Sequence, residues 1–328
     1  MAGRAVCHAD AGPQASQVKG TLKFFAAPQH EAKPGHPRLA RAARRPYSAI
    51  LAGWVRVGAA RDRRHMGGLG RTALGVGLAL LAAVAAARAD SFQATYDISI
   101  VGLPLGQAYA KASLEPKAYA IDIGVKLTGV AALVTDARGA ASASGALKDA
   151  QVLPGAYATT NVTAQETRTV RMGLNAGTVR AVDIQPPFAD MGERVPVTDT
   201  MKRRVLDPVS ALLMRVPDGK ALVGPDACDR TIPVFDGLVR FNVQLSYVGV
   251  REAEARGYAG PVTVCAARYT PLGGYKRDSS ATRFLAENRD MEVWLAPIER
   301  ARALVPFRAA IRTSSGMLTV EAAEFHVE

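Results

Sequence analysis

Residues 92–100, with the sequence FQATYDISI, alternate apolar and polar side chains over nine positions. A period of two is typical of a β-strand that has one dry face and one face in water. Strands buried in parallel sheets tend to be apolar on both faces, so the clean alternation favours an antiparallel sheet.

The same alternation recurs along the rest of the chain. Turn residues at 102–106 separate the first stretch from a second one at 107–114, which predicts a hairpin, and a third stretch follows at 119–127. Further predicted strands cover residues 137–147, 152–160, 161–174, 178–184, 239–248, 262–269, 290–295, 305–313 and 317–327. In the last of these the apolar parity changes at Ala322 and Ala323, and we expect a β-bulge there that keeps both apolar sets on the core side.

One segment has helical periodicity instead. Asp207 can cap a helix, Pro208 fits its first turn, and residues 217–219 (Pro-Asp-Gly) end it. The apolar residues follow the spacing i, i+3, i+4, i+7: Val209, Leu212, Leu213 and Val216. We therefore predict a helix over 207–216 that packs on the dry face of the sheet.

Many half-buried strands and one short helix predict an all-β, mainly antiparallel fold. We expect a strongly curved sheet forming an open or half-closed barrel, with the helix on its concave face, because a long twisted sheet must curl or split to cover its dry side. Two packed sheets are the alternative. Residues 90–328 are expected to form a single domain.

The positive charge of the chain is concentrated outside that domain. The formal net charge is +12, of which residues 1–89 carry +11 and residues 90–328 carry +1. Binding to a phosphate backbone depends on many Lys and Arg contacts, so we expect no nucleic-acid partner.

Residues 66–89 have the features of a secretory signal peptide. Arg71 precedes an uncharged run from Thr72 to Ala87, and Ala87-Arg88-Ala89 is a small-x-small cleavage pattern. The run is short for a membrane-spanning helix, although a retained anchor is an alternative. We expect cleavage after Ala89, a periplasmic protein, and membrane contact only through the signal peptide before cleavage.

Residues 1–65 show neither a hydrophobic period nor turn signals. We interpret them as a dispensable leader, with translation starting at Met66. An Arg-rich targeting presequence or a basic arm is the alternative.

Two cysteines, Cys228 and Cys265, fall in the domain. In an exported protein the pair predicts a disulfide, and two free thiols are the alternative. Residues 90–328 contain a single histidine, His326, and no further Cys or His at the spacing that metal ligands require. We therefore predict no metal site and no cofactor.

The patterns that could indicate catalysis have simpler explanations. His326 alternates with apolar residues of a strand, residues 139–145 (GAASASG) only loosely resemble a nucleophile elbow, and the carboxylates of 287–292 lie on one short strand segment. Gly68-x-Gly70-x-x-Ala73 lacks the strand that a dinucleotide fingerprint needs before it. We expect no catalytic residue.

A basic cluster, Met201-Lys-Arg-Arg204, precedes the predicted helix. It could contact anionic lipid headgroups, but a solvated loop is the simpler interpretation.

A set of motifs in the domain resembles a known family. The motifs are LDPVSALL (206–213), Cys228-Asp229, CAARYTPLGGYKR (265–277), WLAP (294–297) and LVPF (304–307). Together they resemble the bacterial envelope family catalogued as domain of unknown function 3108. The resemblance implies an exported antiparallel β protein without an assigned catalytic residue. It also implies that Cys228 and Cys265 form a disulfide.

We therefore expect a non-enzymatic envelope protein that binds an apolar or lipid-like ligand in the curve of its sheet. The alternative is an interaction or scaffolding module that binds an envelope protein partner through sheet edges. A hydrolase with an unrecognised site is the third hypothesis.

Overall fold

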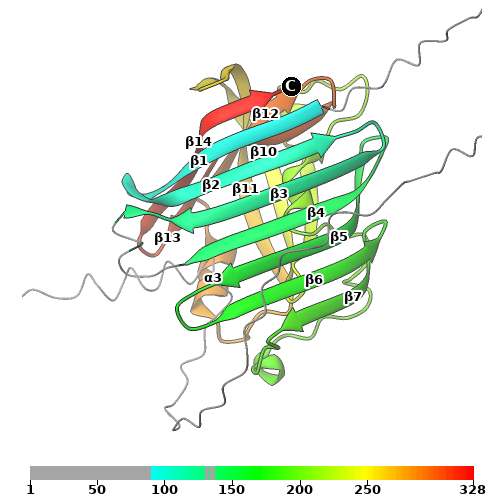
Figure 1. The fold of residues 1–328 in the computed structure, drawn as a ribbon, viewed down its shortest axis with the longest axis vertical. Coiled ribbons are helices and arrows are strands. Elements are labelled where there is room, and N and C mark those ends of the chain that lie inside the picture. Colours follow the sequence, from blue (N-terminus) through cyan, green and yellow to red (C-terminus); the bar gives the residue numbers. More distant parts are fainter. Residues whose placement is uncertain (1–89, 130–131, 133–136) are drawn as a thin grey trace, which may run out of the picture. The chain divides into compact units, whose positions relative to one another are not determined.

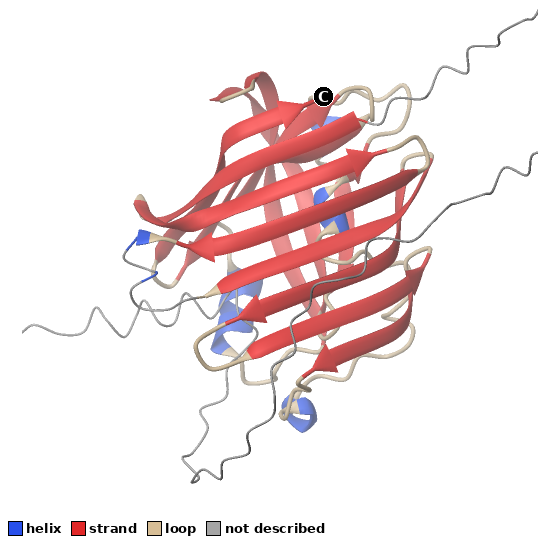
Figure 2. Cartoon of the chain, viewed as in Figure 1, coloured by secondary structure: helices blue, strands red, loops and turns tan. Residues whose placement is uncertain are grey.

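A computed structural model describes residues 90–129, 132 and 137–328. The predicted leader (1–65) and signal peptide (66–89) lie outside the described residues. The predicted fold class is confirmed, since the described chain is mainly one antiparallel sheet that does not close on itself (Figures 1 and 2). Within the described chain, no helix has both the length and the apolar character needed to cross a membrane.

The sheet has the strand order β7-β6-β5-β4-β3-β2-β1-β14-β13-β12-β11-β10-β9, and β8 pairs with β13. The strands are β1 (Asp90–Ile100), β2 (Leu103–Leu114), β3 (Ala118–Leu127), β4 (Arg138–Lys148), β5 (Gln151–Val162), β6 (Thr167–Asn175), β7 (Thr178–Gln185), β8 (Met214–Arg215), β9 (Arg230–Phe235), β10 (Arg240–Ala255), β11 (Tyr258–Gly273), β12 (Met291–Ile298), β13 (Ala303–Thr313) and β14 (Gly316–Val327). In Figure 1 strands β2–β7 form the near layer, and β10, β11 and β13 lie behind it.

The strands lie close to the predicted positions, but β2 begins at Leu103, inside the predicted turn at 102–106, and β8 was not predicted as a strand. There are three further differences. The stretch predicted as one strand at 161–174 is divided by a turn, because Thr163 Oγ1 accepts the N–H groups of Gln165 and Glu166. Strand β9 was not predicted, since its six residues include Pro233. Strands β10 and β11 extend well beyond the predicted bounds, to sixteen residues each.

The predicted bulge in β14 is confirmed. Thr95 pairs with Glu324 while Tyr96 pairs with Ala322, so Ala323 is the extra residue. The bulge brings Leu318, Ala322 and Phe325 to the buried side although their sequence parities differ.

The gap between the edge strands β7 and β9 is spanned by residues 202–206. On one side, Val179 N–H donates to the carbonyl of Lys202 (3.0 Å). On the other side, Leu206 N–H donates to the carbonyl of Pro233 (2.8 Å). This segment makes the open sheet a half-closed barrel.

One end of the barrel is closed by the hairpin of β10 and β11. Its tip reaches β14, where Phe325 N–H donates to the carbonyl of Arg256 (2.8 Å). Tyr258 at the tip packs on Phe307 and Phe325, with ring centroids 5.5 and 5.1 Å apart, and Phe325 also packs on Phe92 at 4.9 Å. We call this end the closed end.

The helix predicted over 207–216 is much shorter in the structure. Val209 is its N-cap residue, and Asp207 lies two residues earlier, where its Oδ1 accepts the N–H groups of Val209 (3.0 Å) and Ser210 (2.8 Å). The helix is the single 3-10 turn η2 (Ser210–Leu212), and Leu213 is already extended and leads into β8. The prediction of helix length was wrong because pairing of β8 with β13 overrides the helical spacing of the apolar residues.

The α-helix α3 (Ser280–Glu287) was not predicted. Ser279 caps it, since its Oγ accepts Thr282 N–H at 3.1 Å. None of its residues is fully buried, and at eight residues it is shorter than a typical helix, so it does not stand out in the sequence. The two remaining 3-10 turns are η1 (Met191–Glu193) and η3 (Pro225–Ala227).

Candidate functional site

The interior of the barrel contains an apolar cavity of about 540 Å³. Its walls come from the concave faces of β1–β3 on one side and of β9–β14 on the other, with η2 and α3 contributing Leu212 and Leu285. The apolar lining includes Phe92, Tyr96, Ile98, Ile121, Ile123, Val125, Leu213, Met214, Val234, Phe241, Val243, Leu245, Met291, Val293, Val305, Ile311 and Val320.

A second hollow of about 300 Å³ continues from this cavity. The two share the lining residues Ile98, Ile123 and Val125, so they adjoin each other along β1 and β3. The second hollow is lined by Val101 and Leu103 of the β1–β2 turn. It lies at the strand ends opposite the closed end, and we call it the mouth.

Three charged residues border the cavity, and each is engaged elsewhere. Arg308 pairs with Glu321 (3.4 Å), Glu292 accepts the indole N–H of Trp294 (2.5 Å), and Arg268 donates to the carbonyl of Asn288 (3.1 Å). Arg268 and Glu292 have the strand parity opposite to that of their apolar neighbours in the lining. The cavity therefore suits an uncharged, apolar group.

Small side chains create part of this space. On β2 the concave positions are Ala108, Ala110 and Ala112, and on β4 they include Ala141 and Ala143. An alanine at such a position leaves volume that a Leu or Ile would fill. This row of small residues is the one signal in the sequence that could have indicated a cavity.

A buried hydrogen-bonded chain attaches η2 to the sheet. Tyr119 Oη and Ser210 Oγ are 2.6 Å apart, and Ser210 Oγ donates to Asp207 Oδ2 at 2.5 Å. Burial raises the pKa of Asp207, against the effect of its hydrogen bonds. Asp207 and Ser210 are fully buried, so these groups hold Leu212 and Leu213 in place and are not exposed to a substrate.

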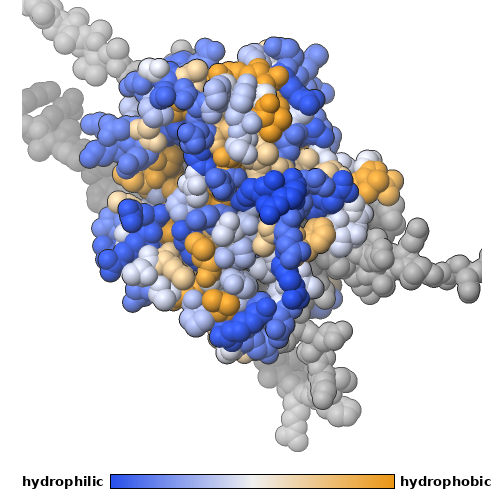
Figure 3. Space-filling model, turned by 180° about the vertical axis from the view of Figure 1, so that it is seen from behind, coloured by the Kyte–Doolittle hydropathy of each residue, from blue (hydrophilic) through white to orange (hydrophobic). Residues whose placement is uncertain are grey.

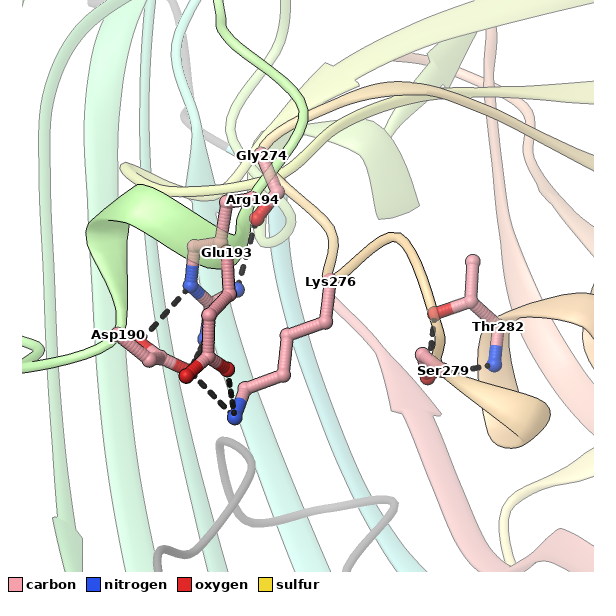
Figure 4. Close-up of polar contacts among 7 residues, drawn as sticks. All are labelled: Asp190, Glu193, Arg194, Gly274, Lys276, Ser279 and Thr282. Atoms are coloured by element: carbon pink, nitrogen blue, oxygen red, sulfur yellow. Dashed lines mark hydrogen bonds and ion pairs between the residues drawn. The ribbon is translucent and has the colours of Figure 1, made fainter.

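An ionic cluster holds the connection after β7 against the connection that leads to α3 (Figure 4). The Arg194 guanidinium donates to both carboxylate oxygens of Asp190 (3.0 and 2.9 Å) and to the carbonyl of Gly274 (2.7 Å). Lys276 Nζ lies 2.8 Å from Asp190 and 3.3 Å from Glu193. Burial opposes ionisation of Asp190, but the hydrogen bonds and charges of Arg194 and Lys276 outweigh it and lower its pKa to about 2.

The structure joins Cys228 and Cys265 by a disulfide, with the two Cα atoms 5.5 Å apart and both residues fully buried. The bridge fixes the end of η3 to the middle of β11. It lies in a second core cluster with Leu245, Leu295 and Leu304, of which Leu245 also lines the cavity.

The other candidate residues do not converge. His326 is exposed at the end of β14, and residues 139–145 lie within β4. In the 287–292 set, Asp290 pairs with Arg312 at 2.5 Å. In the basic cluster, Lys202 pairs with Asp199 at 3.3 Å. Among the described residues no group of three His, Cys, Asp or Glu side chains could hold a metal ion.

Comparison with known proteins identifies a family. Among curated proteins, none matches this chain. A crystal structure described as a beta-barrel-like protein of domain of unknown function DUF1849 from Brucella abortus aligns with 74% of this chain and 100% of its own, at 8% identity and a TM-score of 0.41. The family model described as Protein of unknown function (DUF3108) matches residues 92–323. This chain therefore belongs to the DUF3108 family, as its motifs led us to expect.

Proposed function

We propose that the domain is a non-enzymatic, exported protein of the cell envelope that binds an apolar or lipid-like ligand in the barrel. The observation that carries this proposal is the cavity of about 540 Å³ and its apolar lining. Ligand sites typically enclose roughly 300–1,000 Å³ and are lined mainly by apolar side chains.

The size of the cavity favours a ligand over loose packing. Protein interiors are close-packed, and an unfilled hollow costs free energy that rises with its volume. A large apolar hollow that adjoins the mouth is therefore better explained by an apolar occupant than by loose packing.

The buried acids support binding rather than catalysis. Asp207 accepts the N–H group of Val209 at the start of η2, and Asp236 Oδ1 accepts the N–H groups of Leu238 (2.8 Å) and Val239 (2.6 Å). Burial raises the pKa of Asp236, as it does for Asp207. Both shifts belong to groups that are already occupied by structural hydrogen bonds. Export is supported by the predicted signal peptide and by the disulfide.

A cavity-filling substitution tests the proposal. Leu212 is 38% exposed and lines the cavity, so Leu212→Trp should fill part of it without disturbing the core. We expect fluorescence titration with N-phenyl-1-naphthylamine to show binding to the wild-type protein and binding about tenfold weaker or worse to the variant, since a blocked pocket loses apolar contact area.

Val250→Trp is the matched control, because Val250 is 44% exposed on β10 and does not line the cavity. It should bind the probe like the wild type. Mass spectrometry of lipid extracted from protein purified from the cell envelope identifies a natural ligand. Equal probe binding by Leu212→Trp and the wild type would refute the proposal.

A second candidate function is scaffolding through a sheet edge. Strand β9 pairs with β10 only over residues 240–245, so β10 has no strand partner on that side beyond Leu245 among the described residues. Tyr247, Val248 and Val250 are exposed on this part of β10. Seen from behind, apolar residues lie in separate patches between hydrophilic ones (Figure 3). Loss of a partner protein on Val248→Lys, with unchanged probe binding, would favour this function.

A further inference from the structure

The interior face of β5 changes from apolar to polar toward the mouth. Tyr157, Thr159 and Asn161 alternate along the same side of this strand, and Tyr157 belongs to the main core. Thr159 and Asn161 both line the mouth. The part of the mouth that β1 and β3 form stays apolar, with Ile98 and Ile123 in its lining. The mouth therefore has one apolar wall and one polar wall.

Strand β6, which lies beside β5 in the near layer (Figure 1), changes in the same way. Met172 and Val170 are buried on its interior face, and the next residue on that face is Arg168. Arg168 lies directly opposite Asn161 in the pairing of β5 with β6. Residues directly opposite each other in an antiparallel pair have Cβ atoms roughly 4.5–5.5 Å apart, so these two polar side chains are neighbours.

Both residues have hydrogen-bond donors without an acceptor. The half-buried side chain of Asn161 has no hydrogen-bond partner among the described residues, and it lies over Gly139, where an added Cβ would be 3.1 Å from its Oδ1. Arg168 stacks on the ring of Phe188 (3.7 Å to the centroid) and pairs with Glu166 (2.6 Å). The Nε of Arg168 is nevertheless buried without a hydrogen-bond partner. Buried donors are nearly always paired in native proteins, so an acceptor oxygen of a bound molecule would account for this pair of donors.

We propose that the ligand is a long-chain amphiphile, bound with its apolar chain in the cavity and its head group against the polar wall of the mouth. The head group offers an acceptor oxygen to the amide of Asn161 and to the guanidinium of Arg168, as a carboxylic acid or an ester does. A plain hydrocarbon would leave both donors unpaired. This assignment rests on the proposed ligand function and narrows it to one class of molecule.

Water is the competing partner for the two donors. If water alone pairs with them, Asn161→Leu should not weaken the binding of an amphiphile, because the variant only adds apolar surface to the mouth. If a head group binds there, the variant should weaken the binding of an amphiphile and leave the binding of a probe without an acceptor oxygen unchanged or tighter. Asn161 suits this test because its side chain makes no hydrogen bond that the fold would lose.

Calorimetric titration with palmitic acid tests the assignment, on protein purified from the cell envelope and stripped of lipid. We expect the wild type to bind, and Asn161→Leu to bind roughly threefold to tenfold more weakly, as the loss of one hydrogen bond predicts. N-phenyl-1-naphthylamine, which has no acceptor oxygen, should bind Asn161→Leu at least as tightly as the wild type. Arg168→Met keeps the stem of the side chain and removes its donors, so it should lose at least as much affinity for palmitic acid, with urea unfolding to show that it is folded.

Thr160→Val is the matched control. Thr160 is next to Asn161 on the other face of β5, where its Oγ1 lies 3.1 Å from Thr169 Oγ1, and it does not line the mouth. This variant should bind palmitic acid like the wild type. Titration with 1-palmitoyl-lysophosphatidylethanolamine separates a free acid from a lysophospholipid as the source of the chain: the ligand that binds more tightly, and more weakly to Asn161→Leu, is the source.

The possible failures are distinguishable. If the wild type binds neither palmitic acid nor the lysophospholipid, or if Asn161→Leu binds them as tightly as the wild type does, the amphiphile assignment is overturned. Binding of N-phenyl-1-naphthylamine that Leu212→Trp weakens would then still support the apolar cavity. If the proposed function itself fails, the wild type binds neither the probe nor palmitic acid, or Leu212→Trp binds both unchanged.

Discussion

Leu212 and Leu213 are neighbours in the chain but lie in different surroundings. Both line the cavity, but Leu213 is 2% exposed and belongs to the main core, whereas Leu212 is 38% exposed. Leu213→Ala should therefore lower the free energy of unfolding by about 2 to 5 kcal/mol, because it removes buried methyl groups and leaves a void.

Leu212→Ala should cost less than about 1 kcal/mol, as expected for a partly exposed side chain, and should weaken binding of an apolar probe. Urea unfolding of both variants measures the difference. Equal losses of stability would show that the cavity beside Leu212 is closed in solution.

Asp190 makes stability depend on pH in the acid range. Its pKa of about 2 lies below the usual value near 4, so the folded state binds the proton less tightly than the unfolded chain does. The stabilisation by ionised Asp190 is complete above about pH 4 and is lost as the pH falls through about 2.

Asp190→Asn should lower stability at neutral pH by about 3 kcal/mol, because Arg194 remains buried without its carboxylate partner. The variant should also show a flatter pH dependence between pH 4 and 2. Denaturant unfolding across this range tests both. An unchanged slope would mean that other carboxylates dominate acid unfolding.

At the scale of elements, the disulfide joins η3 to β11 across 37 residues of sequence. Closing a loop of this length should stabilise the fold by roughly 3 to 4 kcal/mol in the chain-entropy model. Reduction should therefore lower the thermal midpoint, and so should the double variant Cys228→Ser/Cys265→Ser.

Thiol counting under denaturing, non-reducing conditions should find neither cysteine free. The Cys double variant gives the matched control, since a reductant should not change its thermal midpoint. Two free thiols in protein from the envelope fraction would contradict the bridge.

Elements were predictable where local pattern and tertiary contact agree. The alternation of apolar and polar residues was sufficient to predict β1–β3, and the parity change at Ala322 and Ala323 was sufficient to predict the bulge in β14. Both signals are local, because the side chains of a strand alternate with a period of two. The apolar residues of segment 207–216 have helical spacing, yet after one turn the backbone becomes a strand, β8, because it pairs with β13. Helix α3 was missed because, at eight residues, it is shorter than a typical helix, although its apolar residues do follow a helical period.

At the scale of the whole molecule, the half-closed barrel could be predicted from the number of amphipathic strands. The cavity could not, because it depends on where small side chains such as Ala110 and Ala141 meet larger ones across the interior. The ionic cluster was also not predictable, since Lys276 and the carbonyl of Gly274 lie about eighty residues along the chain from Asp190 and Arg194. Sequence patterns indicate which face of a strand is buried, but they do not indicate how far apart the opposite walls of the barrel lie.

The position of β14 between β1 and β13 has a consequence for the order of folding. Strands β2–β7 and β9–β13 pair largely with their neighbours in sequence, so each half can form early from local contacts. The seam between β1 and β14 joins residues more than two hundred positions apart, and Ser91 and Glu328 exchange both of their backbone hydrogen bonds there. The barrel therefore cannot be completed until the last strand has emerged, and a chain that is translocated from its front end would assemble only after it has crossed the membrane.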